Sequence, residues 1–126
     1  MPRLLPLAAT LALGLAALPA EAFIAQNDMN VSPEGGGFHV AFKAGAGVND
    51  YWCAAGDYVI RDLGLSRSTR IWRVSPPPRR AGEGISFSLT PEGAARSTGL
   101  AVYPETGSLP AHHAEALCWE PKIEED

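Results

Sequence analysis

The stretch "NDYWCAAGDYVIRDLGL", Asn49–Leu65, determines how this chain folds, because it carries every signal of a single α-helix. Asn49 is a favourable N-cap, and Asp50 places negative charge in the first turn, where the helix dipole favours it. Gly64 is placed to end the helix in the left-handed conformation, with Leu65 completing a Schellman cap. The pattern predicts a helix of about fifteen residues, whose inward side carries Trp52, Cys53, Gly56, Val59, Ile60 and Leu63.

The outward side of this predicted helix is charged. Asp57 and Arg61 are four residues apart on that side, with the acid preceding the base, which is the order that suits an exposed ion pair. The helix therefore has one face for a core and one face for water.

Four segments around the helix have the character of β-strands. Residues 38–43 ("FHVAFK") and 85–90 ("ISFSLT") alternate apolar and polar side chains, as half-buried strands do. Residues 67–75 ("RSTRIWRVS") are rich in bulky and β-branched side chains, and 100–104 ("LAVYP") form a last short strand. These elements predict an α+β fold in which a small antiparallel sheet of about four strands packs on one main helix, with a short C-terminal helix over 111–119.

The N-terminus has the form of a secretory signal. Residues 4–18 are an uncharged apolar run, Pro19 breaks it, and "AEA" at 20–22 has the small-x-small form that a signal peptidase reads. A membrane anchor is the alternative, but the run is shorter than the roughly 20 residues of a spanning helix. We expect residues 1–22 to be a signal peptide cleaved after Ala22, which gives a periplasmic or secreted product with no membrane span.

The rest of the chain has the size and composition of one small globular domain. The formal net charge is −4, and this mild acidity argues against a nucleic-acid partner, because phosphate binding needs a strongly basic face. We expect residues 23–37, which end in "SPEGGG", to be a flexible lead-in, 38–119 to be a single domain, and 120–126 to be a frayed, charged tail.

The chain has two cysteines, Cys53 and Cys118. An even number in an exported chain most often forms disulfides, because that compartment is oxidising, and with two the pairing is fixed. A reactive or metal-binding thiol pair is the alternative, but such sites favour a close Cys-x-x-Cys spacing that this chain lacks.

The histidines are the candidates for catalysis or metal binding. His112 and His113 are adjacent, so on a helix they point about 100° apart and rarely share one metal ion. Glu115 and Cys118 would complete a ligand set, but Cys118 is expected in the disulfide, and a solvated helix face is the interpretation that we favour. His39 has the chemistry of a general base, yet no motif ties a nucleophile or carboxylate to it. The sequence therefore predicts no catalytic residue, no metal ligand and no cofactor.

Basic residues concentrate in one region of this acidic chain. At a sheet edge they would form a cationic patch for an anionic partner, such as an acidic protein or a surface of lipid head groups. The alternative is that the charges protect an edge strand from aggregation. The patch consists of Arg67, Arg70, Arg73, Arg79 and Arg80.

The motif "DYWCAAGDYV" at residues 50–59, followed by "RIWRV" at 70–74 and a Pro-rich loop, resembles a group of short uncharacterised exported proteins of Gram-negative bacteria. A helix-borne cysteine and a C-terminal cysteine recur in that group. The resemblance therefore implies export and pairing of Cys53 with Cys118, and it implies no activity.

Three hypotheses about function follow. The first is a non-catalytic exported domain that binds a partner, and the second is a small hydrolase or metal-binding protein that uses His39, His112 or His113. The third, an inhibitor of a cell-wall enzyme, fits the size and the disulfide but has no motif behind it. Alanine at all three histidines separates the first hypothesis from the second, because only an enzyme or metal protein would lose its function.

Overall fold

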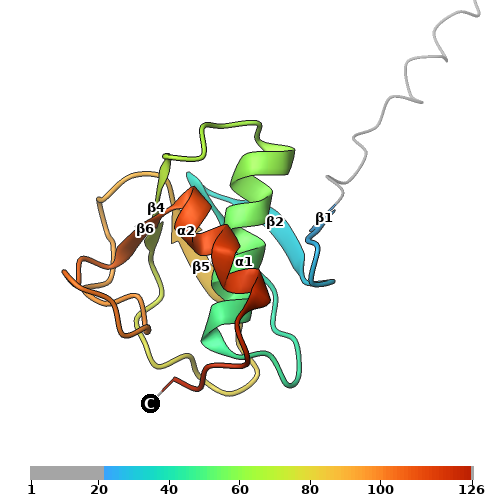
Figure 1. Ribbon diagram of the computed structural model, residues 1–126, viewed down its shortest axis with the longest axis vertical. Helices are drawn as coiled ribbons and strands as arrows, with labels where there is room; N and C mark the ends of the chain where they lie inside the picture. The colour runs from blue at the N-terminus through green and yellow to red at the C-terminus, as the bar shows by residue number, and fades with distance from the viewer. Residues whose placement is uncertain (1–21, 126) are drawn as a thin grey trace, which may run out of the picture.

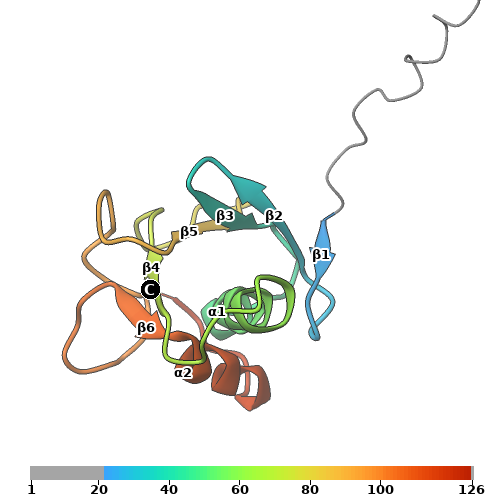
Figure 2. The same ribbon diagram turned by 90° about the horizontal axis from the view of Figure 1, so that it is seen from above.

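The predicted helix lies at the centre of the fold in a computed structural model that describes residues 22–125. The helix α1 (Val48–Asp57) continues into one π-helical turn, η2 (Tyr58–Asp62). A curved sheet wraps around α1, and α2 (Ala111–Ala116) closes the side that the sheet leaves open (Figures 1 and 2). The predicted signal peptide, apart from its last residue, lies outside the described residues.

The N-cap of α1 lies two residues before the predicted N-cap, Asn49. Gly47 is the N-cap, and its N–H donates to the carboxylate of Asp50 at 2.8 Å, so Asp50 does stabilise the first turn. Asn49 lies inside the helix, is fully buried, and accepts a hydrogen bond from the N–H of Ile123 at 2.8 Å. The prediction of Asn49 as a cap is wrong because its amide bonds to the C-terminal segment and not to its own helix.

The backbone at the end of the helix has the predicted conformation, but the side chain of Leu63 does not lie on the predicted face. Gly64 has a φ of +66°, and the N–H of Leu65 donates to the carbonyl of Val59 at 3.0 Å. The N–H of Leu63 donates five residues back, to the carbonyl of Tyr58, at 2.9 Å. This wider turn rotates Leu63 away from the predicted apolar stripe, and its side chain is exposed.

The helix α1 is buried nearly all round, because the sheet covers one side and α2 the other. Asp57 is therefore fully buried, and the predicted exposed pair with Arg61 is exposed only at the arginine. The guanidinium donates to both carboxylate oxygens at 2.6 Å, and the N–H of Gln26 donates to one of them at 2.8 Å. The hydrogen bonds to Asp57 raise the pKa of Arg61 above its usual value.

The sheet confirms the predicted α+β class and antiparallel pairing, but across residues 22–125 it has six strands and not about four. The spatial order is β1-β2-β3-β5-β4-β6, and every neighbouring pair is antiparallel. The strands are β1 (Phe23–Ile24), β2 (Asn30–Glu34), β3 (Gly37–Val40), β4 (Arg70–Arg73), β5 (Ile85–Ser88) and β6 (Ser108–Pro110).

The additional strands come from segments that the pattern did not assign to the sheet. Residues 23–37, expected as a lead-in, form β1 and β2, and Met29 and Val31 bury their side chains in the core. Residues 100–104, expected as a strand, form an irregular loop, because the N–H of Val102 bonds locally to the carbonyl of Leu100. The place beside β4 is taken by β6 instead.

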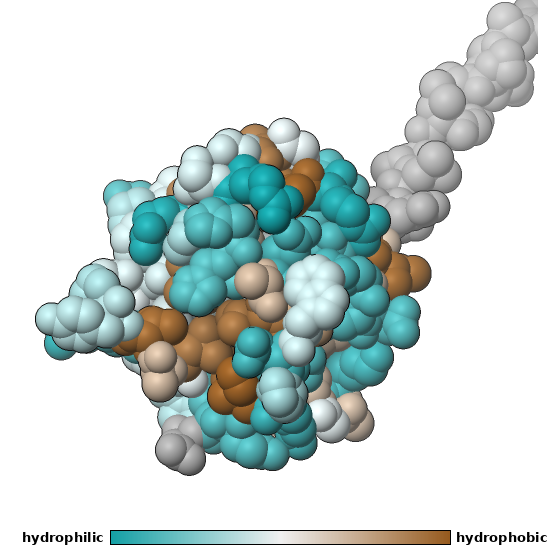
Figure 3. Space-filling model, in the orientation of Figure 1, coloured by the Kyte–Doolittle hydropathy of each residue, from teal (hydrophilic) through white to brown (hydrophobic). Residues whose placement is uncertain are grey.

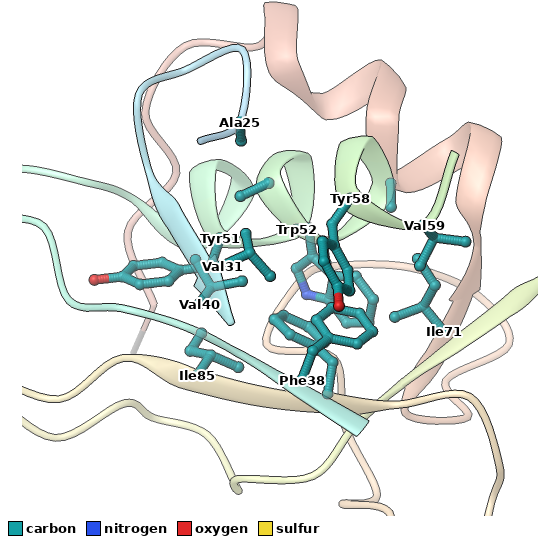
Figure 4. Packing of buried hydrophobic residues seen from close by; sticks show 14 of the residues in the cluster. Ala25, Val31, Phe38, Val40, Tyr51, Trp52, Tyr58, Val59, Ile71 and Ile85 are labelled. Carbon is teal, nitrogen blue, oxygen red and sulfur yellow. The ribbon is translucent and has the colours of Figure 1, made fainter. Parts of the chain in front are cut away.

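Aromatic side chains fill the space between α1 and the sheet (Figure 4). The ring of Phe38 lies 4.8 Å from that of Tyr58 and 5.7 Å from that of Phe87. Trp52 meets Phe87 edge to face at 4.8 Å, and its indole N–H donates to the carbonyl of Thr98 at 3.0 Å. These contacts fix the two central strands β3 and β5 against the helix.

The disulfide predicted between Cys53 and Cys118 is present, with a Cα–Cα distance of 4.7 Å. It joins α1 to η3 (Leu117–Trp119), the 3₁₀ turn that follows α2. The two helices approach closely at Gly56, where a Cβ atom would lie 2.6 Å from the backbone nitrogen of Glu115. Within residues 22–125, no helix is both long enough and apolar enough to cross a membrane.

The phenol of Tyr58 gives a test of this packing. Burial, and then the negative charge of Asp62, raise the pKa of Tyr58 above its ordinary value of 10.0. The phenol therefore ionises at a lower pH in the unfolded chain than in the folded chain. The contribution of Tyr58 to the free energy of unfolding is complete below pH 10 and is lost as the pH rises through the pKa of the folded state. Subtracting the absorbance titration of Tyr58→Phe from that of the wild type isolates the ionisation of Tyr58. We expect the midpoint of this difference curve to lie above pH 10.0. A midpoint at or below 10.0 would contradict the burial, whereas Asp62→Asn is expected to lower the midpoint only in part.

Candidate functional site

The face of the sheet that points away from α1 carries a small polar cluster. Along β3 and β5 the side chains alternate, so that Phe38 and Phe87 enter the core while His39 and Ser86 point outward. The register places His39 directly opposite Ser86. Two residues that are 47 positions apart in the sequence are thus cross-strand neighbours.

A carboxylate completes this cluster. Nδ1 of His39 lies 2.9 Å from the hydroxyl of Ser86, which donates to the carboxylate of Glu34 at 2.7 Å. The same nitrogen is 3.8 Å from the other oxygen of Glu34, at the end of β2. The three side chains therefore hold one another in place. His39 and Ser86 are half-buried, and Glu34 is exposed.

Two hollows open on either side of the Ser86 hydroxyl, with volumes of about 320 and about 310 Å³. We call the cluster and its two hollows the Ser86 site. The first hollow is lined by His39, Ala41, Phe42, Ser75, Gly82, Glu83, Gly84 and Ser86. The second is lined by Glu34, Gly36, Gly37, Val74, Ser86, Phe87, Ser88, Thr90 and Glu92.

Glycine at two positions keeps these hollows open. A Cβ atom on Gly84 would collide with the backbone carbonyl of Val40 and lie 2.8 Å from Nε2 of His39. A Cβ atom on Gly37 would collide with the backbone carbonyl of Phe87. In both cases the neighbouring backbone lies too close for a Cβ atom, and neither glycine places a side chain in the hollow that it lines.

We expect Gly84→Ala to lower the free energy of unfolding by about 2 kcal/mol, because the added methyl group must push back the carbonyl of Val40. Gly36→Ala is the matched control, since a Cβ atom there meets nothing within 4 Å. Urea denaturation of both variants measures the difference. Equal stability of the two variants would show that Gly84 is not closely packed.

The hydrogen bonds of the cluster are not those of a Ser–His–acid triad. In a triad the serine hydroxyl donates to one ring nitrogen while the carboxylate binds the other. Here Nδ1 of His39 faces both partners, and the proton of Ser86 points to Glu34. The backbone N–H of Ser86 donates to Ser75 at 3.0 Å, so it is not free to stabilise an oxyanion. The arrangement is suited to binding and not to attack by Ser86.

The two histidines of the C-terminal helix lie elsewhere. His112 and His113 are exposed on α2, and Cys118 is in the disulfide. Glu115 accepts a hydrogen bond from Arg67 at 2.8 Å. Within residues 22–125, no three His, Cys, Asp or Glu side chains gather as a metal site requires.

Two arginines of the predicted patch serve the fold. Arg73 is fully buried and forms an ion pair with Glu125. Arg79 lies over the rings of Phe42 and Tyr51, at 5.3 and 5.2 Å from their centroids. Arg73 is therefore covered by the chain's own residues, Glu125 among them, and Arg79 is partly used in packing.

The other three arginines of the predicted patch have different surroundings. Arg67 pairs with Glu115, and Nε of Arg70 donates to the hydroxyl of Ser108 at 3.0 Å. Arg80 is exposed in the loop after β4. Arg67 and Arg70 lie before and at the start of β4, whereas Arg80 follows β4 in a loop, and the chain runs between these segments from one end of the molecule to the other (Figure 1).

The C-terminal segment is docked on the fold, contrary to the prediction of a frayed tail. The carbonyl of Ile123 accepts from the N–H of Val48 at 2.9 Å, and its N–H donates to Asn49. Glu125 reaches Arg73, and its side chain is only 10% exposed. Asn49 and Arg73 together explain the docking, because each is a buried polar group that needs a partner.

Sequence reasoning found His39 and missed Ser86 and Glu34. The alternation in 38–43 and 85–90 did indicate that His39 and the serines of "ISFS" point away from the core. The pairing of β3 with β5 brings them together, and nothing in the separate patterns shows this register. No protein-family model, curated protein or solved structure matches this chain. The function of the Ser86 site is therefore inferred from its own side chains.

Proposed function

We propose that this chain is an exported, non-catalytic binding protein, and that the Ser86 site takes a small, neutral, hydroxyl-rich ligand such as a sugar. The observation that carries the proposal is the convergence of His39, Ser86 and Glu34 between two glycine-opened hollows. Concave sites with a few converging polar groups are the usual form of small-molecule sites. The disulfide, and the absence of a membrane-spanning helix within residues 22–125, fit a secreted protein.

The lining favours a ligand that both donates and accepts hydrogen bonds. Serine and threonine hydroxyls can do either, and a carboxylate accepts from a ligand hydroxyl. Glu34, Glu83 and Glu92 border the hollows, so an anionic ligand would be repelled. Each hollow, at about 310–320 Å³, is at the lower end of the range for small-molecule sites. A neutral polyol of one or two rings satisfies all three conditions.

An aromatic side chain on the same face adds to this proposal. The register pairs Trp72 of β4 with Ser88 of β5, and Ser88 with Gly37 of β3. Trp72 is half-buried, whereas its neighbours Ile71 and Arg73 are fully buried on the inner side. Trp72 does not itself line the second hollow, but it is the cross-strand neighbour of Ser88, which does. The apolar face of an indole suits the C–H face of a sugar ring.

Calorimetric titration with a hexose, an amino sugar, a uronic acid and a neutral disaccharide tests the proposal. We expect the neutral sugars to bind and the uronic acid not to bind. His39→Ala is expected to weaken binding about tenfold or more, because it removes a ring nitrogen and releases Ser86. His112→Ala is the matched control and should bind like the wild type.

Two outcomes would contradict the proposal. One is the absence of heat with all four sugars, and the other is equal binding by His39→Ala and the wild type. Hydrolysis of a p-nitrophenyl ester that Ser86→Ala abolishes would favour the alternative of a small hydrolase.

A further inference from the structure

A buried arginine holds the C-terminal segment of the chain. Arg73 donates to the carbonyls of Ser75 at 2.7 Å and Thr98 at 3.0 Å, and it is fully buried. Its remaining partner is the carboxylate of Glu125, at 2.5 Å from one guanidinium nitrogen and 3.4 Å from another. The backbone N–H of Arg79 donates to the same carboxylate at 2.8 Å. Glu125 is thus recognised as a bound carboxylate would be.

The residues just before Glu125 are held in the manner of a bound peptide. The backbone of Ile123 exchanges hydrogen bonds with the N–H of Val48 and the side chain of Asn49, at 2.9 and 2.8 Å. Its side chain packs against the edge of the core. Figure 1 shows this last segment running past the first turn of α1. Backbone hydrogen bonds, one apolar side chain and one carboxylate are the elements of peptide recognition.

The surface that receives the segment is built entirely by earlier residues. Arg73 is fixed by two carbonyls that do not belong to the segment, and Asn49 is fixed in α1. Two glycines leave the room that the segment fills. A Cβ atom on Gly47 would lie 2.6 Å from the carbonyl oxygen of Ile123, and one on Gly99 would collide with the carboxylate of Glu125. The site is therefore shaped around an extended acidic segment.

A groove of about 550 Å³ continues from this site along the surface. Apolar residues lie between the loop around residue 100 and the C-terminal segment, and Figure 3 shows brown atoms on this face. Pro77, Leu100, Ala101 and Ile123 line the groove, together with the carboxylates of Glu124 and Glu125. The groove therefore runs alongside the segment that the site now holds, and Ile123, Glu124 and Glu125 form part of its wall.

We propose that Arg73, Arg79, Val48 and Asn49 form a peptide-binding site for an acidic segment that has an apolar residue two positions before a glutamate. The C-terminal residues Ile123–Glu125 occupy the site as an intramolecular ligand. A buried guanidinium without an anion is costly, so only a segment that brings a carboxylate replaces them. The attached segment is present at a high effective concentration and competes with any peptide in solution.

The test uses the full chain with Ile123→Ser and Glu125→Gln, which weakens the attached segment and leaves the receiving surface intact. The probe is a fluorescent peptide of residues 122–126, "KIEED", followed by anisotropy. We expect it to bind the variant about tenfold or more tightly than it binds the wild type, whose own segment competes. A peptide with glutamine at the position of Glu125 should bind the variant about tenfold or more weakly. The peptide "KEEID", with the same composition in another order, is the matched control.

Equal binding by "KIEED" and "KEEID", or equal binding to variant and wild type, would overturn the proposal. So would the absence of binding to a variant that is folded by circular dichroism. If the double variant does not fold, the chain with Glu125→Gln alone takes its place. In that chain, failure of "KIEED" to bind and to raise the melting temperature would overturn the proposal as well.

Discussion

Replacing both cysteines, Cys53→Ala with Cys118→Ala, is expected to lower the free energy of unfolding by about 4 kcal/mol. The bond joins residues that are 65 positions apart, and it closes a loop that includes nearly two thirds of the described chain. Without it the unfolded chain gains the entropy of that loop, while α2 keeps its packing on α1 and its hydrogen bonds to residues 67–69. Urea denaturation of the oxidised wild type and the double variant measures the loss.

The reduced wild-type chain is the control for this prediction, because it keeps both side chains and lacks only the bond. We expect its stability to match that of the double variant within about 1 kcal/mol, since the cavity left by removing two sulfur atoms is small. A loss of less than about 1 kcal/mol in the double variant would show that the bond does not hold α2 on α1.

Trp52→Ala is expected to cost about 4 kcal/mol, because it empties the space between α1 and the central strands. The indole is fully buried, meets Phe87 edge to face, and donates to the carbonyl of Thr98. That carbonyl also accepts from Arg73, so loss of the indole N–H alone leaves no buried oxygen without a partner.

Trp52→Phe separates the two contributions of the indole. It keeps most of the apolar contact with Phe87 and removes the hydrogen bond, and we expect a loss of about 1–2 kcal/mol. Thermal and urea denaturation of both variants measure the effect. A cost for Trp52→Phe as large as that for Trp52→Ala would show that the hydrogen bond to Thr98, and not the packing, stabilises this region.

The helix and the disulfide could be predicted from the sequence because their signals are local or forced. Asp50, Gly64 and the apolar spacing act within one helix, and two cysteines allow one pairing. The strands at 38–43 and 85–90 showed period-two alternation, and both contain strands of the sheet. Local patterns therefore predicted the central helix, the disulfide and the middle strands of the sheet.

The segments that were assigned wrongly depend on contacts far away in the sequence. Residues 23–37 are rich in turn-forming residues, and they become strands only because β3 offers a partner. Asn49 and Arg73 look like surface residues in the sequence, yet both are buried by the docked C-terminal segment. The docking of the C-terminal segment thus explains why Asn49 is not a cap and why Arg73 is not exposed.

The candidate site could be predicted only in part, because it too depends on contacts between residues that are far apart in the sequence. His39 could be assigned to the outer face, but its partner Ser86 lies across a strand pair and Glu34 lies in a segment expected as a lead-in. His39, for which the sequence predicted no catalytic role, belongs to a polar cluster on the outer face of the sheet. The cluster joins one histidine to a serine and a glutamate, whereas His112 and His113 remain on the opposite, helical side of the fold.

The most direct test of the central claim, that the outer face of the sheet binds a neutral sugar, is a backbone-amide NMR titration of the oxidised chain with a neutral disaccharide. The binding account predicts shifts concentrated at His39, Ser86 and Ser88, with none at His112 or Val48. Shifts at the C-terminal groove alone, or no shifts at saturating sugar, would contradict it.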